Sequence, residues 1–584
     1  MDRTRLIFLL IVAAAVIFAC GVVGYQMLTN FSGNIGGETE SSSETKSSPL
    51  PRDSILVTLA SSNTKRNWLD QVVAQFNAEN HTTADGNTVI VEASHVTSGG
   101  SMNGILDGNI QPVAWSPGDQ SWVGQANDTW QTRNNKTIAS EACQATINAP
   151  LGFAMWKPMA ETLGWPNDPI GWDTIVELAA DPEGWASYGR PEWGQFRFGH
   201  THPAYANSGL LSMTGFVYGI AGENLTAADI YSEPVQTAMQ DLQQSTSKYG
   251  RQAPALLELM AREGPSYLHA AAVPEADTVR FNVERGDELA FPLAFIFPSG
   301  GTIWADHPYC ILDNADWVTP EQAEAAAIFQ DYLQAPEQQK VAIDSYLRPL
   351  DSSIPLHAPL DLANGTDPSV TQDTIPALPS PTTEISNAVI DIFQLNKRKA
   401  TILVVLDVSG SMEGDKIKSA RESTAEFLDR LDADDEVGVM IFSDEPNMLA
   451  APERTGDIVE GLSQRVAELL ANGNTALYES VCDATKALLK AQTEDLENGE
   501  SRLYGIVLLS DGEDTVGRIT ENQMFATCLP ANAEADGVKI FPIAFGEEAD
   551  TDVLTQIANV TGGRMYTADP ESISNVYISI SAEQ

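Results

Sequence analysis

The chain has 584 residues, of which 43% are hydrophobic, so it is long and apolar enough for several folded domains and is not a disordered protein. Its formal net charge is −47, and so acidic a surface repels nucleic acid and anionic lipid headgroups. We therefore expect no nucleic-acid partner.

The first segment along the chain predicts a membrane anchor. Arg3 and Arg5 precede the uncharged apolar run Leu6–Leu28, which at about 1.5 Å per residue is long enough for a transmembrane helix. Basic residues before such a helix keep the N-terminus inside and place the rest of the chain outside the cytoplasm. We expect a single-pass protein of the cell membrane with residues 1–29 as its anchor. A cleaved signal peptide and lipidation at Cys20 are the alternatives.

Composition divides the remaining chain into two folded blocks. Residues 30–53 are rich in Ser, Glu, Thr and Gly, which predicts a flexible linker, and residues 363–384 form a second linker of proline and small polar residues. We therefore expect one domain at residues 54–362 and another at residues 385–584.

The block 54–362 twice repeats the order strand, small-residue turn and amphipathic helix, in ILVTLASSNTKRNWLDQVV and TVIVEASHVTSGGSMNGIL. Such turns leave backbone N–H groups free for a bound oxygen. This order, with the closing FPSGGTIWADHPY sequence and Arg348–Pro349, resembles bacterial extracellular solute-binding proteins of the periplasmic type 2 class. The resemblance implies two α/β lobes, a hinged cleft and a small ligand between the lobes.

Candidate ligand contacts follow from this resemblance. They are small polar residues and glycines at strand–helix turns: Ser61, Ser62, Ser98, Gly99, Gly100, Ser101, Ser116, Asn207 and Ser208. Each is also an ordinary choice for a helix cap or a turn, and a cleft that binds no solute is an open alternative.

The block 385–584 predicts a second α/β fold. Four apolar runs (ATILVVLD, EVGVMIFSD, YGIVLLSD and VKIFPIAFG) end near Asp or Gly, and segments of helical period separate them. We expect a doubly wound, Rossmann-like parallel sheet, in which ligands bind at the carboxyl ends of the strands.

Oxygen-bearing side chains gather at these expected strand ends. Asp407, Ser409 and Ser411 follow the first run, Thr475 precedes a later helix, and Asp511 ends another run. Hard divalent cations prefer such ligands, so we expect Mg²⁺, or Mn²⁺ or Ca²⁺ in its place. Capping of the next helix is the alternative role. The neighbouring acids are expected to be solvated: Glu413, Asp415, Glu513 and Asp514.

The DVSGSM sequence at residues 407–412, with the later threonine and SDG, resembles the von Willebrand factor A domain and its metal-ion-dependent adhesion site (MIDAS). The resemblance implies that Ser409, Ser411 and Thr475 contact the metal and that both aspartates assist. It also implies an open position for a carboxylate from a partner protein, and binding without catalysis. A cytoplasmic metal-chelatase role is disfavoured because the sequence has no GxxxxGK[ST] loop and carries the apolar N-terminal run.

Four cysteines lie outside the N-terminal run and allow three pairings. Pairing Cys143 with Cys310 and Cys482 with Cys528 keeps each disulfide within one domain, which suits an extracytoplasmic protein. Buried free thiols are the alternative.

We therefore expect a membrane-anchored extracytoplasmic binding protein that is not an enzyme. Its A domain would hold a divalent metal and dock a protein partner, and its solute-binding domain would sense or present a small ligand. In the alternative, the protein is the solute receptor of an ABC transporter and the A domain is a tether.

Overall fold

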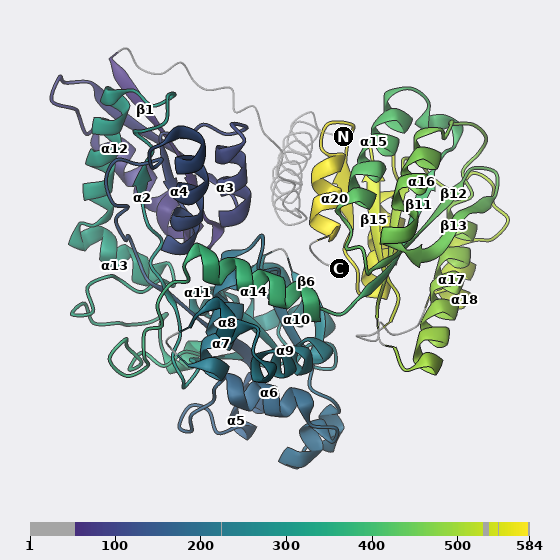
Figure 1. Ribbon diagram of the computed structural model, residues 1–584, viewed down its shortest axis with the longest axis horizontal. Helices are drawn as coiled ribbons and strands as arrows, with labels where there is room; N and C mark the ends of the chain where they lie inside the picture. The colour runs from purple at the N-terminus through teal and green to yellow at the C-terminus, as the bar shows by residue number, and fades with distance from the viewer. Residues whose placement is uncertain are drawn as a thin grey trace, which may run out of the picture. The chain divides into compact units, whose positions relative to one another are not determined.

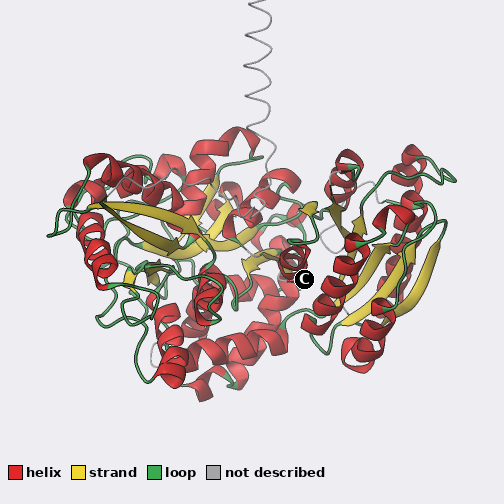
Figure 2. Ribbon diagram, turned by 90° about the horizontal axis from the view of Figure 1, so that it is seen from above, coloured by secondary structure: helices red, strands yellow, loops and turns green. Residues whose placement is uncertain are grey.

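The computed structural model describes residues 53–222, 225–250, 252–500, 502–529, 537–546 and 548–581. The predicted membrane segment Leu6–Leu28 and the linker up to residue 52 lie outside the described residues. Within the described ranges, no helix combines the length and the apolar character needed to cross a membrane. The fold is α/β, as expected, and contains three separate sheets (Figures 1 and 2).

The first lobe is built on a four-stranded sheet with the order β10-β3-β1-β2. Its strands are β1 (Ser54–Ser61), β2 (Thr88–His95), β3 (Ala114–Ser116) and β10 (Cys310–Ile311). Its helices are α2 (Arg66–Glu79), α3 (Ser98–Leu106), α4 (Gln120–Asn134), α12 (Pro320–Leu333) and α13 (Pro336–Asp344). Strands β1, β2 and β3 are parallel, so the turns after them lie at one edge of the sheet.

The second lobe has a sheet of order β6-β5-β7-β4-β8, with β9 also paired to β4. Its strands are β4 (Ala149–Trp156), β5 (Phe198–Thr201), β6 (Thr246–Gly250), β7 (Ala270–Pro274), β8 (Leu293–Ile296) and β9 (Trp304–Ala305). Its helices are α5 (Lys157–Thr162), α6 (Trp172–Ala180), α7 (Asn207–Ala221), α8 (Ala227–Ile230), α9 (Glu233–Ser245), α10 (Ala253–Glu263) and α11 (Glu275–Arg285). The chain enters this lobe at β4 and returns to the first lobe at β10, as a two-lobed module requires.

Helix α14 (Thr383–Asn396) lies in the region that the sequence analysis assigned to the C-terminal domain, but it packs on the second lobe. Its buried residues Ile385, Val389 and Ile392 belong to the same hydrophobic cluster as the core of that lobe. Its apolar positions recur with a helical period and therefore form one face, which covers the second lobe before the chain continues into the next sheet.

The C-terminal domain contains a six-stranded sheet of order β13-β12-β11-β14-β15-β16. Its strands are β11 (Ala400–Asp407), β12 (Glu436–Phe442), β13 (Pro446–Arg454), β14 (Leu503–Ser510), β15 (Lys539–Phe545) and β16 (Tyr566–Ala568). All pairings are parallel except the antiparallel pair of β12 with β13. The four predicted strands are β11, β12, β14 and β15, and every residue of β11, β14 and β15 is buried.

Helices cover both faces of this sheet, as Figure 2 shows. One face packs on α15 (Asp415–Arg430), α16 (Thr455–Ala467) and α20 (Ile573–Ser581), and the other on α17 (Leu477–Asn498), α18 (Glu521–Thr527) and α19 (Thr551–Thr561). Alternating strand residues separate the two clusters, because Ile402 and Val404 face one layer and Leu403 and Val405 face the other. The sheet is therefore doubly wound, and its polar groups remain at the strand ends.

Candidate functional site

The predicted metal ligands meet at the carboxyl ends of β11 and β14. These two strands are parallel neighbours, with Leu406 opposite Leu509. Asp407 therefore ends β11 at the same level as Ser510, and Asp511 follows directly. Strand β12 lies on the other side of β11, so this is the point where the direction of strand order reverses.

Hydrogen bonds connect the predicted ligands into one chain. The backbone N–H of Ser409 donates to Oδ1 of Asp407 at 2.9 Å, and Oγ of Ser409 lies 3.0 Å from Oγ of Ser411. Ser411 donates in turn to Oδ1 of Asp511 at 2.7 Å. Ser510 donates to the other oxygen of Asp407 at 2.8 Å. Two carboxylates and two hydroxyls from distant parts of the sequence are thus held within hydrogen-bond reach.

Thr475 reaches this site on the loop before α17. The loop is fixed to the Asp407–Ser411 segment by two backbone hydrogen bonds, from Asn472 N–H to Val408 O at 2.8 Å and from Gly410 N–H to Gly473 O at 3.0 Å. Thr475 is buried, and its hydrogen bonds with Thr515 use its backbone groups, so its hydroxyl is a candidate ligand.

Asp514 and Thr515 position the Thr475 loop, and the sequence analysis did not identify this role. Asp514 was expected to be a solvated acid, but its carboxylate accepts hydrogen bonds from the backbone N–H groups of Tyr478, at the start of α17, and Gly517. Thr515 Oγ1 accepts the N–H of Thr475 at 2.8 Å, and the N–H of Thr515 donates back to Thr475 O at 2.9 Å. Asp514 is a half-buried loop acid, and its contacts arise because a helix N-terminus offers free N–H groups that attract a nearby carboxylate.

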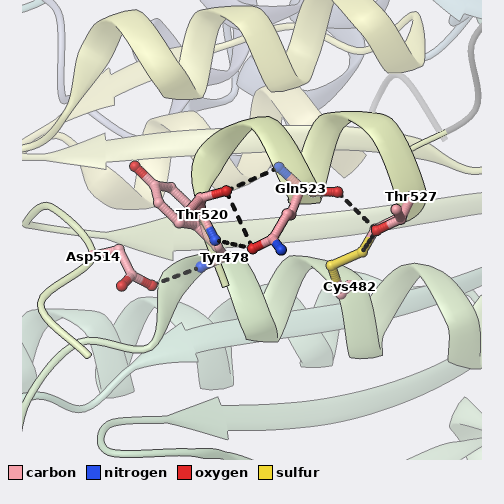
Figure 3. Close-up of a disulfide and its surroundings, with 7 residues drawn as sticks. Tyr478, Cys482, Asp514, Thr520, Gln523 and Thr527 are labelled. Carbon is pink, nitrogen blue, oxygen red and sulfur yellow. Dashed lines mark hydrogen bonds between the residues drawn. A yellow bond between two sulfur atoms is a disulfide. The ribbon is translucent and has the colours of Figure 1, made fainter. Parts of the chain in front are cut away.

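A disulfide connects α17, the helix that follows the Thr475 loop, to the chain just after α18. Cys482 on α17 and Cys528, just after α18, are bonded, with their Cα atoms 5.0 Å apart (Figure 3). Thr520 and Gln523 cap the start of α18 reciprocally, and Asp514 reaches the start of α17 in the same view. The segment after Asp511 is thus attached to α17 at both of its ends.

The donor set fits a hard divalent cation. It consists of two fully buried carboxylates and three hydroxyls, with no nitrogen or sulfur ligand. Burial, with a smaller contribution from the charge of Asp511, raises the pKa of Asp407 to about 6, and hydrogen bonds from Ser409 and Ser510 oppose this rise. A bound cation would stabilise the ionised form of both carboxylates. The described residues contain no group of three or more His, Cys, Asp or Glu side chains arranged to bind a metal, so a cation here depends on the hydroxyls as well.

Lys416 is a further member of the site that sequence reasoning missed. Its Nζ donates to Oδ2 of Asp511 at 2.7 Å, so both oxygens of this carboxylate are engaged. Lys416 is the second residue of α15, five residues after Ser411, and no signal along the sequence pairs it with Asp511.

The predicted solute contacts come together, but they contact protein rather than an open space. Ser61 donates to the carbonyl of Ser62, Ser101 donates to that of Ser98, and Ser98 Oγ accepts the N–H of Gly118. Ser208 Oγ lies 2.7 Å from Thr201 Oγ1. These four serines are buried, and their hydroxyls are used internally.

The two lobes touch at these turns. Trp122 Nε1 of α4 donates to Asn207 Oδ1 of α7 at 2.9 Å. Glycines allow this approach: a Cβ atom at Gly99 would lie 2.9 Å from the carbonyl oxygen of Ala204, and one at Gly118 would lie 2.4 Å from the amide nitrogen of Asn207. Gly100 faces its own turn instead, because a Cβ atom there would meet Thr97 Oγ1.

A buried lysine, which the sequence analysis did not select, lies beside Ser62 and Ser116. Lys65 Nζ donates to Ser62 Oγ at 2.7 Å and to Ser116 O at 2.8 Å, and it lies 3.2 Å from Nδ1 of His307. Burial lowers the pKa of Lys65 well below its ordinary value, and burial also raises the pKa of Asp306 to about 7. Ser116 Oγ is buried with no hydrogen-bond partner among the described residues.

The second disulfide joins Cys143 to Cys310, with Cα atoms 4.5 Å apart, in the first lobe. It attaches the segment before β4 to β10, and so links the chain that leaves the lobe to the chain that returns. Both disulfides join the cysteines that the one-domain pairing selected.

Comparison with known proteins identifies both modules. A family model described as "Bacterial extracellular solute-binding protein" matches residues 57–348, half of the chain. The chain belongs to this family. A second model, "von Willebrand factor type A domain", matches residues 401–577, so this solute-binding protein carries a C-terminal A domain that includes all five predicted metal ligands.

Individual relatives match one module each. The inter-alpha-trypsin inhibitor heavy chain H4 of Sus scrofa is 30% identical over 163 residues, 28% of this chain and 17% of that protein. The chain thus spans about one sixth of the length of that relative. A solved periplasmic thiamin binding protein has a TM-score of 0.41 at 12% identity and covers 59% of this chain and 96% of its own. A solved von Willebrand factor type A protein from Catenulispora acidiphila has a TM-score of 0.28 at 19% identity and covers 32% and 42%.

Proposed function

We propose that this protein is a membrane-anchored extracytoplasmic binding protein whose A domain holds Mg²⁺, or Mn²⁺ or Ca²⁺, at Asp407, Ser409, Ser411, Thr475 and Asp511. The observation that carries the proposal is the hydrogen-bonded chain from Asp407 through both serines to Asp511 at neighbouring strand ends. Oxygen ligands held this close suit a hard cation. The protein would act by binding rather than by catalysis.

The metal would in turn dock a protein partner. Ser411 is exposed, whereas both aspartates are buried, so a bound cation would face solvent on the serine side. A carboxylate from a partner would fill a coordination position there, since hard cations favour such a ligand. We expect the wild-type protein to capture envelope proteins in Mg²⁺ and not in EDTA. Variants that lack a metal ligand should not capture them.

The metal site can be tested directly by isothermal titration calorimetry of EDTA-treated protein with Mg²⁺. We expect one site in the wild type and an affinity loss of at least about 100-fold in Asp511→Asn, because a charged ligand is lost with little change of shape. Asp415→Asn is the matched control, since Asp415 is an exposed acid close by in sequence. Equal affinity in wild type and Asp511→Asn would disprove the proposed site.

For the solute-binding module we propose the capture or presentation of a small solute. The family match supports this role, and the buried hydroxyl of Ser116 would be an unused donor for a ligand oxygen. Delivery to an ABC permease would be an alternative use of the same module. A selective rise in melting temperature with one class of oxyanion, sugar or amino acid would support solute capture, and no rise across a broad panel would contradict it.

A further inference from the structure

Lys416 places its ammonium group beside the predicted metal ligands, which we call the metal loop (Asp407–Ser411, Thr475 and Asp511). Its Nζ lies 2.7 Å from Oδ2 of Asp511. The side chain of Asp511 is 0% exposed and that of Lys416 is 28% exposed. A lysine that reaches solvent therefore pairs with a carboxylate that does not.

The backbone around the lysine leaves room for this reach. Gly546, directly after β15, has a φ of +93°, and a Cβ atom built on it would lie 3.6 Å from Cε and 3.7 Å from Nζ of Lys416. The lysine stem thus passes over the end of β15 to reach Asp511 at the end of β14. Its position is set by the same strand ends that carry the predicted metal ligands.

Without a metal, negative charges outnumber positive charges at the metal loop. Asp407 and Asp511 are two buried carboxylates, and in the described part of the chain Lys416 is the one cationic side chain paired with either of them. A monovalent cation that took the place of the ammonium would add no net charge, whereas a divalent cation would add one positive charge. Buried ion pairs are stabilised by charge compensation, so only the divalent exchange improves the balance.

We propose that Lys416 is a built-in counter-ion that neutralises Asp511 until a divalent cation displaces it, and that it thereby sets the affinity and the valence selectivity of the metal site. The inference rests on the proposed metal-binding function of the A domain. Displacement would move the ammonium toward solvent, next to the position that a partner carboxylate would occupy.

The test compares three variants of the whole protein by calorimetry with Mg²⁺ and by melting temperature in EDTA. Lys416→Met removes the competing charge, so Mg²⁺ should bind about tenfold more tightly, and the melting temperature in EDTA should fall because Asp511 loses its counter-ion. Lys416→Arg keeps the charge and should retain the wild-type affinity within about threefold. Lys418→Met is the matched control, because Lys418 lies on the same helix, is exposed and forms no ion pair among the described residues.

The outcomes separate this inference from the function on which it rests. Weaker or unchanged Mg²⁺ binding in Lys416→Met, when the wild type binds Mg²⁺, overturns the displacement and leaves the metal site intact. Absence of Mg²⁺ binding in the wild type overturns both. If Lys416→Met does not fold in EDTA, Lys416→Gln, which retains a hydrogen-bond donor, replaces it in the titration, and tighter binding is again the expected result.

Discussion

The two strand-end sites of this protein use similar residues and differ in what those residues contact. In the A domain, hydroxyls bond to one another and to two carboxylates, and Ser411 is exposed. In the solute-binding module, Ser61, Ser62 and Ser98 are buried and bond to neighbouring protein groups. The first arrangement is complete within one rigid domain, whereas the second depends on how two lobes meet.

The difference teaches that preorganisation has a different source at each site. Parallel neighbours β11 and β14 fix the distance between Asp407 and Asp511 through the register of the sheet. The contact between Trp122 and Asn207 joins the two lobes, and glycines leave the room for it. A site of the first kind keeps its geometry without ligand, and a site of the second kind is open to change when the lobes move.

The largest expected effect comes from removing the disulfide behind the metal loop. Replacing Cys482 and Cys528 by serine should lower the free energy of unfolding by about 2–4 kcal/mol, because the bond constrains the unfolded chain. It should also weaken Mg²⁺ binding, since α17 and the segment after Asp511 lose their common attachment. Chemical denaturation and calorimetry measure the two effects.

The matched control is the double serine variant of Cys143 and Cys310. It should lose stability as well, but its Mg²⁺ affinity should equal that of the wild type, because this disulfide lies in the first lobe. If both variants lose Mg²⁺ affinity equally, the metal loop is not the more preorganised site and the comparison fails.

A smaller effect is expected at the contact between the lobes. Gly118→Ala would place a Cβ atom 2.4 Å from the amide nitrogen of Asn207, so we expect a cost of about 1–3 kcal/mol in stability and separation of the two turns. All 11 tryptophans lie between residues 68 and 317, so tryptophan fluorescence reports on this module alone.

Gly286→Ala is the control, because Gly286 has an ordinary helical φ of −55° and nothing lies within 4 Å of a Cβ atom built there. A fluorescence change in Gly118→Ala with unchanged Mg²⁺ affinity would sharpen the contrast between the sites. A variant as stable as the wild type would mean that the lobes already lie further apart in solution.

The sequence predicted that the five candidate ligands would come together, because the information for this is local. Each ligand directly follows an apolar strand or precedes a helix, and the parallel order of the strands brings those points together. The strands β13 and β16 were not predicted, because β13 is largely exposed and β16 has three residues. Neither carries a predicted ligand.

Tertiary contacts explain what the sequence did not reveal. The roles of Lys65, Lys416 and Asp514 depend on partners 51, 95 and 36 residues away, to which spacing along the chain gives no guide. Likewise, the apolar face of α14 predicts a buried helix without naming the second lobe as the surface that it covers.

The smallest expected effect is a difference in acid sensitivity between the two modules. Burial lowers the pKa of His269 and His202 to about 3, and Nδ1 of His269 accepts hydrogen bonds from Trp185 Nε1–H and the N–H of Arg197. Between pH 6.5 and 3 these two histidines therefore bind more protons in the unfolded chain than in the folded one, so their contribution to stability falls as the pH falls, and the raised pKa of Asp306 opposes it. The loss should be about 1 kcal/mol for each histidine between pH 6.5 and 5.5.

In the metal-free A domain, Asp407 contributes with the opposite sign. All seven histidines precede residue 358, and the pKa of Asp407 is raised to about 6, so between pH 6 and about 3.8 this carboxyl binds more protons in the folded domain than in the unfolded chain, and its contribution to stability rises as the pH falls. The lowered pKa values of Glu426, Asp434, Asp444 and Asp569 oppose this contribution. Denaturation followed by tryptophan fluorescence in EDTA should show the loss in the solute-binding module, with a shallower pH dependence in His269→Gln. An unchanged slope in that variant would place the acid sensitivity of the module elsewhere. In the A domain, Mg²⁺ should cancel the stability that Asp407 contributes at low pH, because the metal favours the ionised form of this carboxyl.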